Sequence, residues 1–79
     1  MNIKDKCMSW LEEIWVDAPV DVQEGFIKLK EEDLIEFHHT LCRDMRNEND
    51  LWVHRETIGH PDDFSMSVLT DFWRTKNGL

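Results

Sequence analysis

Residues 31–52 read EEDLIEFHHTLCRDMRNENDLW, and this stretch decides the fold that the sequence predicts. It contains no glycine or proline, and its apolar residues recur at the spacing of a helix, about 100° per residue. One face collects Leu34, Ile35, Phe37, His38, Leu41, Cys42 and Met45, and the opposite face collects Glu32, Glu36, Thr40, Arg43 and Asn47. The pattern predicts one central amphipathic helix that frays over residues 47–50, where Asn and Asp side chains compete for backbone hydrogen bonds.

A second helix is predicted near the N-terminus, over residues 3–16. Asn2 supplies a side-chain acceptor for the unpaired N–H groups of the first turn. Pro19 ends the helix, because the residue before a proline is pushed out of the α conformation. Residues 20–29 then predict only a short helical turn, since Gly25 weakens a longer helix.

The clearest helix start in the chain is the HPDD sequence at residues 60–63. Proline fits the first helical position, and the two aspartates lie in the first turn, where the helix dipole favours negative charge. This helix is predicted over residues 61–76, with Gly78 suited to a left-handed cap. Residues 54–60 before it are predicted to form a loop.

These patterns predict an all-α fold in which residues 1–79 form a single domain of three main helices with a short helical connector. No stretch shows the apolar and polar alternation of a strand. The apolar arcs of the first and last helices span about 160° and about 200°, more than one neighbouring helix covers. This surplus predicts a homodimer that forms through the first or the last helix.

The chain carries 17 acidic and 9 basic residues, a net charge of −8. Nucleic acid is an unfavourable partner for such a chain, because phosphate binding depends on Lys and Arg. No run approaches the roughly 18 consecutive apolar residues of a membrane span. No secretory leader pattern opens the sequence, so the prediction is a reduced, cytoplasmic protein in which Cys7 and Cys42 are small core residues.

Several motifs of the second half occur in the same order in a known family. They are EEDLIEFHHTL at residues 31–41, Arg46-Asn47, Leu51-Trp52, HPDD at residues 60–63, Ser65 and Trp73. Over residues 31–75 the chain resembles a family of small bacterial and phage proteins known as a domain of unknown function. Cys42 and Asp50 depart from the family pattern, which has small residues or glycine there, so the turn after the central helix is expected to differ. The resemblance implies a helical fold and a bacterial or phage setting, and it implies no reaction.

Two constellations raise chemical alternatives. His38 and Cys42 are four residues apart on one helix face, a spacing that suits zinc, but no second ligand pair accompanies them, and a core role is favoured. Glu36, His39 and Arg43 are one turn apart, as an acid–base group would be, but such surface groups are usually solvated. The chain also lacks a phosphate loop and a nucleophile with a partnered base. We therefore expect no catalysis and no cofactor.

The remaining signals favour binding to another protein. Four tryptophans in 79 residues suggest aromatic anchors, and the acidic N-terminal third either meets a basic partner surface or only keeps the protein soluble. The predicted contact residues are Glu12, Glu13, Trp15, Asp17 and Trp73. By analogy with small acidic phage proteins, the sequence suggests a non-enzymatic inhibitor of a host protein, such as a component of an antiphage defence system. The alternatives are an antitoxin or immunity-type regulator and a small metal-binding protein.

Overall fold

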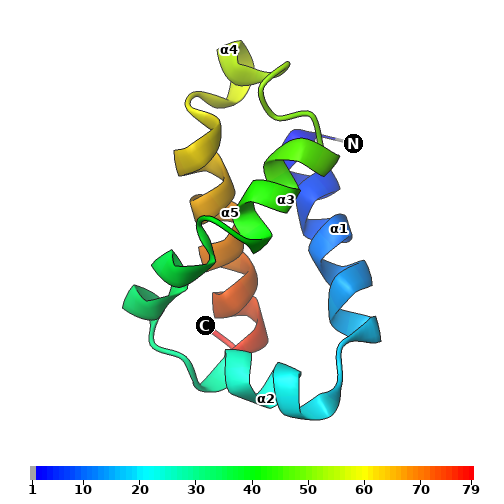
Figure 1. Cartoon of the computed structure of the whole chain (residues 1–79), viewed down its shortest axis with the longest axis vertical. Helices are drawn as coiled ribbons and strands as arrows, with labels where there is room; N and C mark the ends of the chain where they lie inside the picture. Colours follow the sequence, from blue (N-terminus) through cyan, green and yellow to red (C-terminus); the bar gives the residue numbers. More distant parts are fainter. Residues whose placement is uncertain (1) are drawn as a thin grey trace.

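Helix α5 (Pro61–Lys76) lies at the centre of the structure and packs against each of the other helical segments (Figure 1). The structure is a computed structural model that describes residues 2–79. The buried side chains of α5 form one broad face of the helix and are Ser65, Val68, Leu69, Phe72 and Trp73, together with Pro61 at its start. The central position therefore belongs to α5, and the prediction that residues 31–52 form the central helix is wrong.

Five further helical segments surround α5. They are α1 (Ile3–Asp17), α2 (Val20–Lys28), the 3₁₀-helix η1 (Glu31–Phe37), α3 (Leu41–Glu48) and α4 (Arg55–Ile58). The all-α class is confirmed, whereas the predicted count of three main helices with one connector is not. The segments enclose a body of 36 × 24 × 23 Å, with α4 at one end and α2 at the other (Figure 1).

Helix α1 begins and ends where its local signals place it. The side chain of Asn2 accepts a hydrogen bond of 2.8 Å from the backbone N–H of Asp5, and the helix stops just before Pro19. Beyond this corner α2 forms a helix of 9 residues, longer than the predicted turn. Its Gln23 side chain donates a 2.6 Å hydrogen bond to the carbonyl of Trp15. The same carbonyl accepts a 3.1 Å hydrogen bond from the N–H of Ala18, so the Gln23 bond is a second one and connects α2 to the end of α1.

The stretch 31–52 is interrupted at residues 38–40, between η1 and α3. Thr40 has φ −121° and ψ −93°, outside the helical region. The interruption lets the two halves pack in different directions: Phe37 lies against Phe26 of α2, whereas Met45 is buried in the core. A single straight helix would hold both side chains on one face.

The interruption also changes which side chains are exposed. Ile35 is 61% exposed although the helical pattern placed it on the buried face. The carbonyl of His38 accepts a 3.3 Å hydrogen bond from the buried guanidinium of Arg46, so this backbone group has a partner.

A residue with left-handed backbone geometry lies two positions beyond the end of helix α3. Asp50 has φ +52°, and beyond it the N–H of Leu51 donates to the carbonyl of Arg46 at 3.0 Å. The buried side chain of Asn49 donates to the carbonyl of Met45 at 3.0 Å. Left-handed geometry favours glycine, so a non-glycine residue is strained here.

Replacement of this strained residue is expected to stabilise the protein. Asp50→Gly should raise the free energy of unfolding by about 0.5–1 kcal/mol, because glycine adopts the left-handed region without a steric cost. Urea unfolding followed by circular dichroism measures the change. In contrast, Glu48→Gly, in the last turn of the same helix, should lower the free energy of unfolding by up to about 1 kcal/mol. Equal effects of both variants would contradict the assignment of strain to residue 50.

The start and the end of α5 follow the predicted signals. The Nδ1 atom of His60 accepts a 3.2 Å hydrogen bond from the N–H of Asp62. At the other end Gly78 has φ +73°, and the N–H of Leu79 donates to the carbonyl of Arg74 at 2.9 Å. Before α5, the predicted loop contains the single-turn helix α4.

The neighbouring segments cover the whole apolar arc of α5, from Val68 and Phe72 to Leu69 and Trp73, so the prediction that part of this arc stays uncovered is wrong. Helix α1 packs against α5, and so do η1 and α3. Exposed apolar side chains gather instead near the corner between α1 and α2, where Ile14, Val16, Val20 and Val22 are 41–75% exposed. Of the helices within residues 2–79, none combines the length and the apolarity that crossing a bilayer requires.

Candidate functional site

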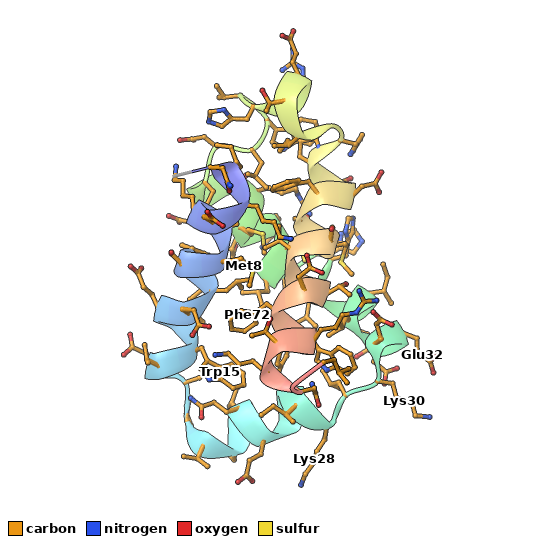
Figure 2. The ribbon with its side chains drawn as sticks, turned by 180° about the vertical axis from the view of Figure 1, so that it is seen from behind. Met8, Trp15, Lys28, Lys30, Glu32 and Phe72 are labelled. Atoms are coloured by element: carbon orange, nitrogen blue, oxygen red, sulfur yellow. The ribbon has the colours of Figure 1, made fainter. Side chains whose placement is uncertain are left out.

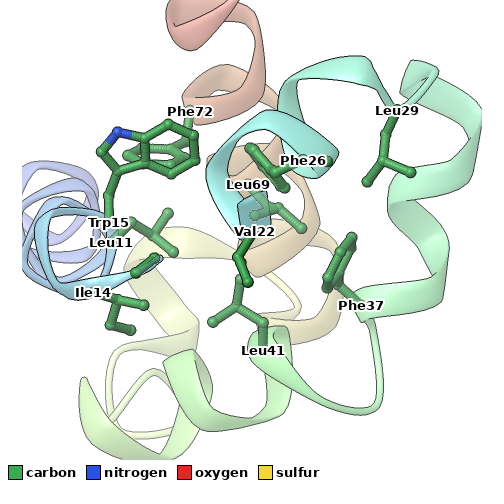
Figure 3. A pocket seen from close by; sticks show the side chains of 12 residues that line it. Leu11, Ile14, Trp15, Val22, Phe26, Leu29, Phe37, Leu41, Leu69 and Phe72 are labelled. Atoms are coloured by element: carbon green, nitrogen blue, oxygen red, sulfur yellow. The ribbon is translucent and has the colours of Figure 1, made fainter. Parts of the chain in front are cut away.

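An apolar pocket of about 340 Å³ opens among α1, α2, η1, α3 and α5 (Figure 3). Its lining residues are Leu11, Ile14, Trp15, Ala18, Val22, Gly25, Phe26, Leu29, Phe37, Leu41, Leu69 and Phe72. The indole nitrogen of Trp15 is the one polar side-chain atom in this set. The volume lies at the lower end of the range of about 300–1,000 Å³ that is usual for ligand pockets.

Two helical stripes of the same spacing form the longer walls. Leu11, Ile14, Trp15 and Ala18 stand at positions i, i+3, i+4 and i+7, and so do Val22, Gly25, Phe26 and Leu29. This spacing places the first three residues of each set on one face of α1 or α2. Ala18 and Leu29 are the C-caps of the two helices and have extended backbone geometry. The chain turns at Pro19, so both stripes line the same space, as Figure 3 shows for Trp15 and Phe26.

Aromatic contacts hold these walls together. The ring of Phe26 lies 5.7 Å from Trp15, 5.9 Å from Phe37 and 6.1 Å from Phe72, measured between centroids. Trp15 and Phe72 are 5.7 Å apart in an edge-to-face arrangement, and Figure 2 shows both side chains between α1 and α5. Such pairs each contribute about 0.5–1.5 kcal/mol beyond the burial of their area. The pocket is therefore part of the packed fold.

The pocket has a buried floor and an exposed mouth. Leu11 and Leu69 are 1% and 0% exposed, whereas Ile14 and Val22 are 41% and 55% exposed. Gly25 also lines the pocket, and a Cβ atom added there would meet no atom within 4 Å. A methyl group at this position therefore has room.

The segment that forms most of the pocket wall carries nearly all the net charge of the protein. Residues 12–36 contain nine carboxylates and two lysines, a net charge of −7, and the rest of the chain has −1. Helix α5 neutralises part of this charge: Lys76 pairs with Glu12 at 2.8 Å, and Arg74 pairs with Glu31. The two lysines of the segment, Lys28 and Lys30, point outward from the α2–η1 end (Figure 2).

Four of the five predicted contact residues lie together on the C-terminal half of α1. Trp15 lines the pocket, and the ammonium of Lys76 lies 5.2 Å from the centre of its ring. Glu12 is engaged by that same lysine, whereas Glu13 and Asp17 are exposed and form no ion pair within residues 2–79.

The fifth predicted contact residue, Trp73, is placed differently. It is 9% exposed and belongs to the hydrophobic core, and no hydrogen-bond acceptor lies beside its buried indole N–H within the described residues. A partner could reach only a narrow edge of this ring. The sequence places Trp73 on the surface because the apolar arc of its helix is wider than one neighbouring helix covers. In the structure several segments together cover that arc.

Most of the pocket was not anticipated from the sequence. The residues that were missed include Val22, Phe26, Leu29, Phe37 and Leu41. The available signal was the repeated spacing of residues 11–18 and 22–29 on either side of Pro19. This signal was lost because residues 20–29 were predicted to form only a short turn.

A polar cluster around Arg46 joins the interrupted stretch to the start of α5. The Nε atom of Arg46 lies 3.2 Å from the carboxylate of Asp62, and its Nη1 donates to the hydroxyl of Ser65 at 3.2 Å. Ser65 in turn donates to the carbonyl of Asp62 at 2.9 Å. Arg46 is 8% exposed and bonded on several sides, so its role is structural. Trp52 is 47% exposed and lies against His60.

The two residues considered for metal binding do not gather further ligands. Cys42 is buried, and its thiol contacts the sulfur of Met66 at 3.6 Å. No group of three or more His, Cys, Asp or Glu side chains suited to a metal ion occurs in the described part of the chain. His38 is half-buried, with its Nε2 atom 4.0 Å from the carboxylate of Asp62.

Both thiols should be unreactive in the folded protein. Burial raises the pKa of Cys42, an effect that Ser65 and Arg46 partly offset, and burial likewise raises the pKa of Cys7. We expect both to react with a disulfide reagent at neutral pH at least about tenfold more slowly in native than in denatured protein. The unfolded thiols ionise at lower pH than the folded ones, so their contribution to stability is complete below the ordinary pKa and is lost at alkaline pH. Rapid labelling of the native protein would contradict the expected low reactivity of the two thiols.

Fold and pocket together define a small all-α protein with an apolar pocket. Most of the lining comes from residues 12–36, the segment that carries most of the negative charge. Comparisons of the chain with protein-family models, with curated proteins and with solved structures find no match. The argument about function therefore depends on the site itself.

Proposed function

We propose that this protein is not an enzyme and acts by binding another protein, whose apolar side chains enter the pocket. The observation that carries the proposal is an open, apolar pocket of about 340 Å³ within a chain of 79 residues. Protein interfaces often depend on a few large side chains that fill such pockets on the partner.

The chemistry of the lining supports a binding role over a catalytic one. Its side chains are aliphatic or aromatic, so the lining offers no acid, base or nucleophile to a bound molecule. It also offers few of the polar groups that usually orient a small ligand in its site. A partner protein can supply orientation from outside the pocket, through contacts with the surrounding surface.

In biological terms we extend the proposal to inhibition of a host protein, such as a component of an antiphage defence system, in the cytoplasm of the host cell. This setting is the one that the sequence resemblance of residues 31–75 implies, and no family model matches the chain. The acidic segment at residues 12–36 supports a partner with a basic surface, including one that otherwise binds nucleic acid. In this proposal the protein acts by covering a surface that its partner needs.

The proposal is tested with a pair of variants at one position. Gly25→Leu is designed to occupy pocket space, whereas Gly25→Ala adds only a methyl group where there is room. Both should fold, and Gly25→Ala should raise the free energy of unfolding by about 0.5–1 kcal/mol because alanine favours the helix.

The readout is affinity purification from host cells with quantitative mass spectrometry. A specific partner should be recovered equally with the wild-type protein and Gly25→Ala, and at least tenfold less with Gly25→Leu. Recovery of the same partner in equal amounts with all three proteins would show that the pocket is not the binding site.

A further inference from the structure

We infer that the pocket receives an amphipathic, positively charged helix of the partner, which inserts two neighbouring apolar side chains. This inference rests on the proposed function and adds the chemical character of the segment that is bound. It depends on three observations: the volume of the pocket, the net charge of residues 12–36, which form most of its lining, and the helical architecture around it.

The volume sets how many side chains enter. An apolar cavity of about 150 Å³ is sufficient for a benzene ring. A pocket of about 340 Å³ therefore accommodates about two groups of that size. On a helix, residues three or four positions apart have Cβ atoms about 5–6 Å from each other, so they can enter one pocket together.

The negative charge of the segment around the pocket determines which residues should flank those two side chains in the partner. Residues 12–36 carry a net charge of −7. Asp17 and Asp21 adjoin the lining residues Ala18 and Val22 in the sequence, and both carboxylates are exposed and unpaired within residues 2–79. A segment flanked by Lys or Arg gains favourable electrostatic contacts at this rim, and an acidic segment is repelled.

Charge also disfavours two other occupants. A second copy of the chain bound through this face in a twofold dimer would bring two segments of charge −7 together. A fatty acid would carry its carboxylate to an acidic rim.

An extended peptide is disfavoured for a different reason. It lacks a docking edge, because residues 2–79 contain no strand to which it could add.

A random peptide library tests the inference without knowledge of the partner. The library is selected on the immobilised full-length protein and depleted on Gly25→Leu. We expect the recovered peptides to have a net positive charge and apolar residues paired at i and i+3 or i+4. Synthetic versions should bind the wild-type protein and Gly25→Ala alike, and Gly25→Leu at least tenfold more weakly.

Charge reversal on each side supplies the control. Replacing the Lys and Arg residues of a recovered peptide by Glu should weaken binding at least tenfold, and Asp17→Lys with Asp21→Lys should weaken binding of the original peptide. Recovery of acidic, neutral or unpaired peptides, or of none that depend on the pocket, would overturn the inference. So would a dimer in sedimentation that Gly25→Leu abolishes.

These outcomes separate the inference from the proposed function. A cellular partner that needs an open pocket but binds through an acidic or extended segment overturns the inference alone. A partner recovered equally with wild type and Gly25→Leu overturns both.

Discussion

Phe72→Ala should lower the free energy of unfolding by about 3–5 kcal/mol, the usual effect of truncating a buried phenylalanine. Phe72 is 3% exposed, and its ring contacts Trp15 and Phe26. At about 0.05–0.15 kcal/mol per residue, the total stability of a chain of 79 residues is about 4–12 kcal/mol. The loss is therefore a large fraction of the total stability, and the variant should unfold at a clearly lower temperature than the wild-type protein, which thermal unfolding followed by circular dichroism would detect.

The control for this prediction is another aromatic residue on the surface. Trp52 is 47% exposed and contacts the ring of His60, so Trp52→Ala should lower the free energy of unfolding by only about 1 kcal/mol. Similar losses for Phe72→Ala and Trp52→Ala would contradict the placement of Phe72 in the core.

Arg46→Ala should lower the free energy of unfolding by about 2–3 kcal/mol. The variant removes a buried guanidinium that bonds to the Ser65 hydroxyl, the Asp62 carboxylate and the His38 carbonyl. Loss of a buried ionic partner often costs about 3–5 kcal/mol, but Asp62 is 37% exposed and water can replace part of its interaction. Urea unfolding of the purified variant measures the effect.

Two substitutions on α3 complete this test. Arg46→Lys keeps the charge but cannot reach three partners with one ammonium group, so we expect a loss of about 1–2 kcal/mol. Arg43→Ala, at an exposed position one turn earlier, should change the free energy of unfolding by no more than about 0.5 kcal/mol. A loss at Arg43 as large as that at Arg46 would refute the structural role of the cluster.

The elements predicted best from the sequence are those with strong local signals at their ends. Asn2 caps α1, and the HPDD sequence starts α5, because hydrogen bonds within the first turn decide both. The interruption at residues 38–40 has no comparable signal. It depends on Arg46, which bonds to a freed carbonyl eight residues earlier in the chain, and on Phe37, which packs against α2.

The candidate site was predicted only in part. Of the predicted contact residues, Trp15 alone lines the pocket, and it was singled out from the helical wheel, which is a local property. The pocket requires the chain to turn at Pro19 so that α2 brings Phe26 against Phe72. Such a contact between residues far apart in the sequence cannot be inferred from either helix alone, and the same limitation explains why Trp73 was expected on the surface.

The uneven charge of the chain also affects how it meets other molecules. The C-terminal half of α1, α2 and η1 occupy the end of the molecule opposite α4, and residues 12–36 carry −7 of the total charge of −8 (Figure 1). In the proposed complex this uneven charge would orient the protein in the electric field of a basic partner before the two make contact. Added salt should slow such encounters while the lifetime of the complex, set by the apolar contacts, changes much less.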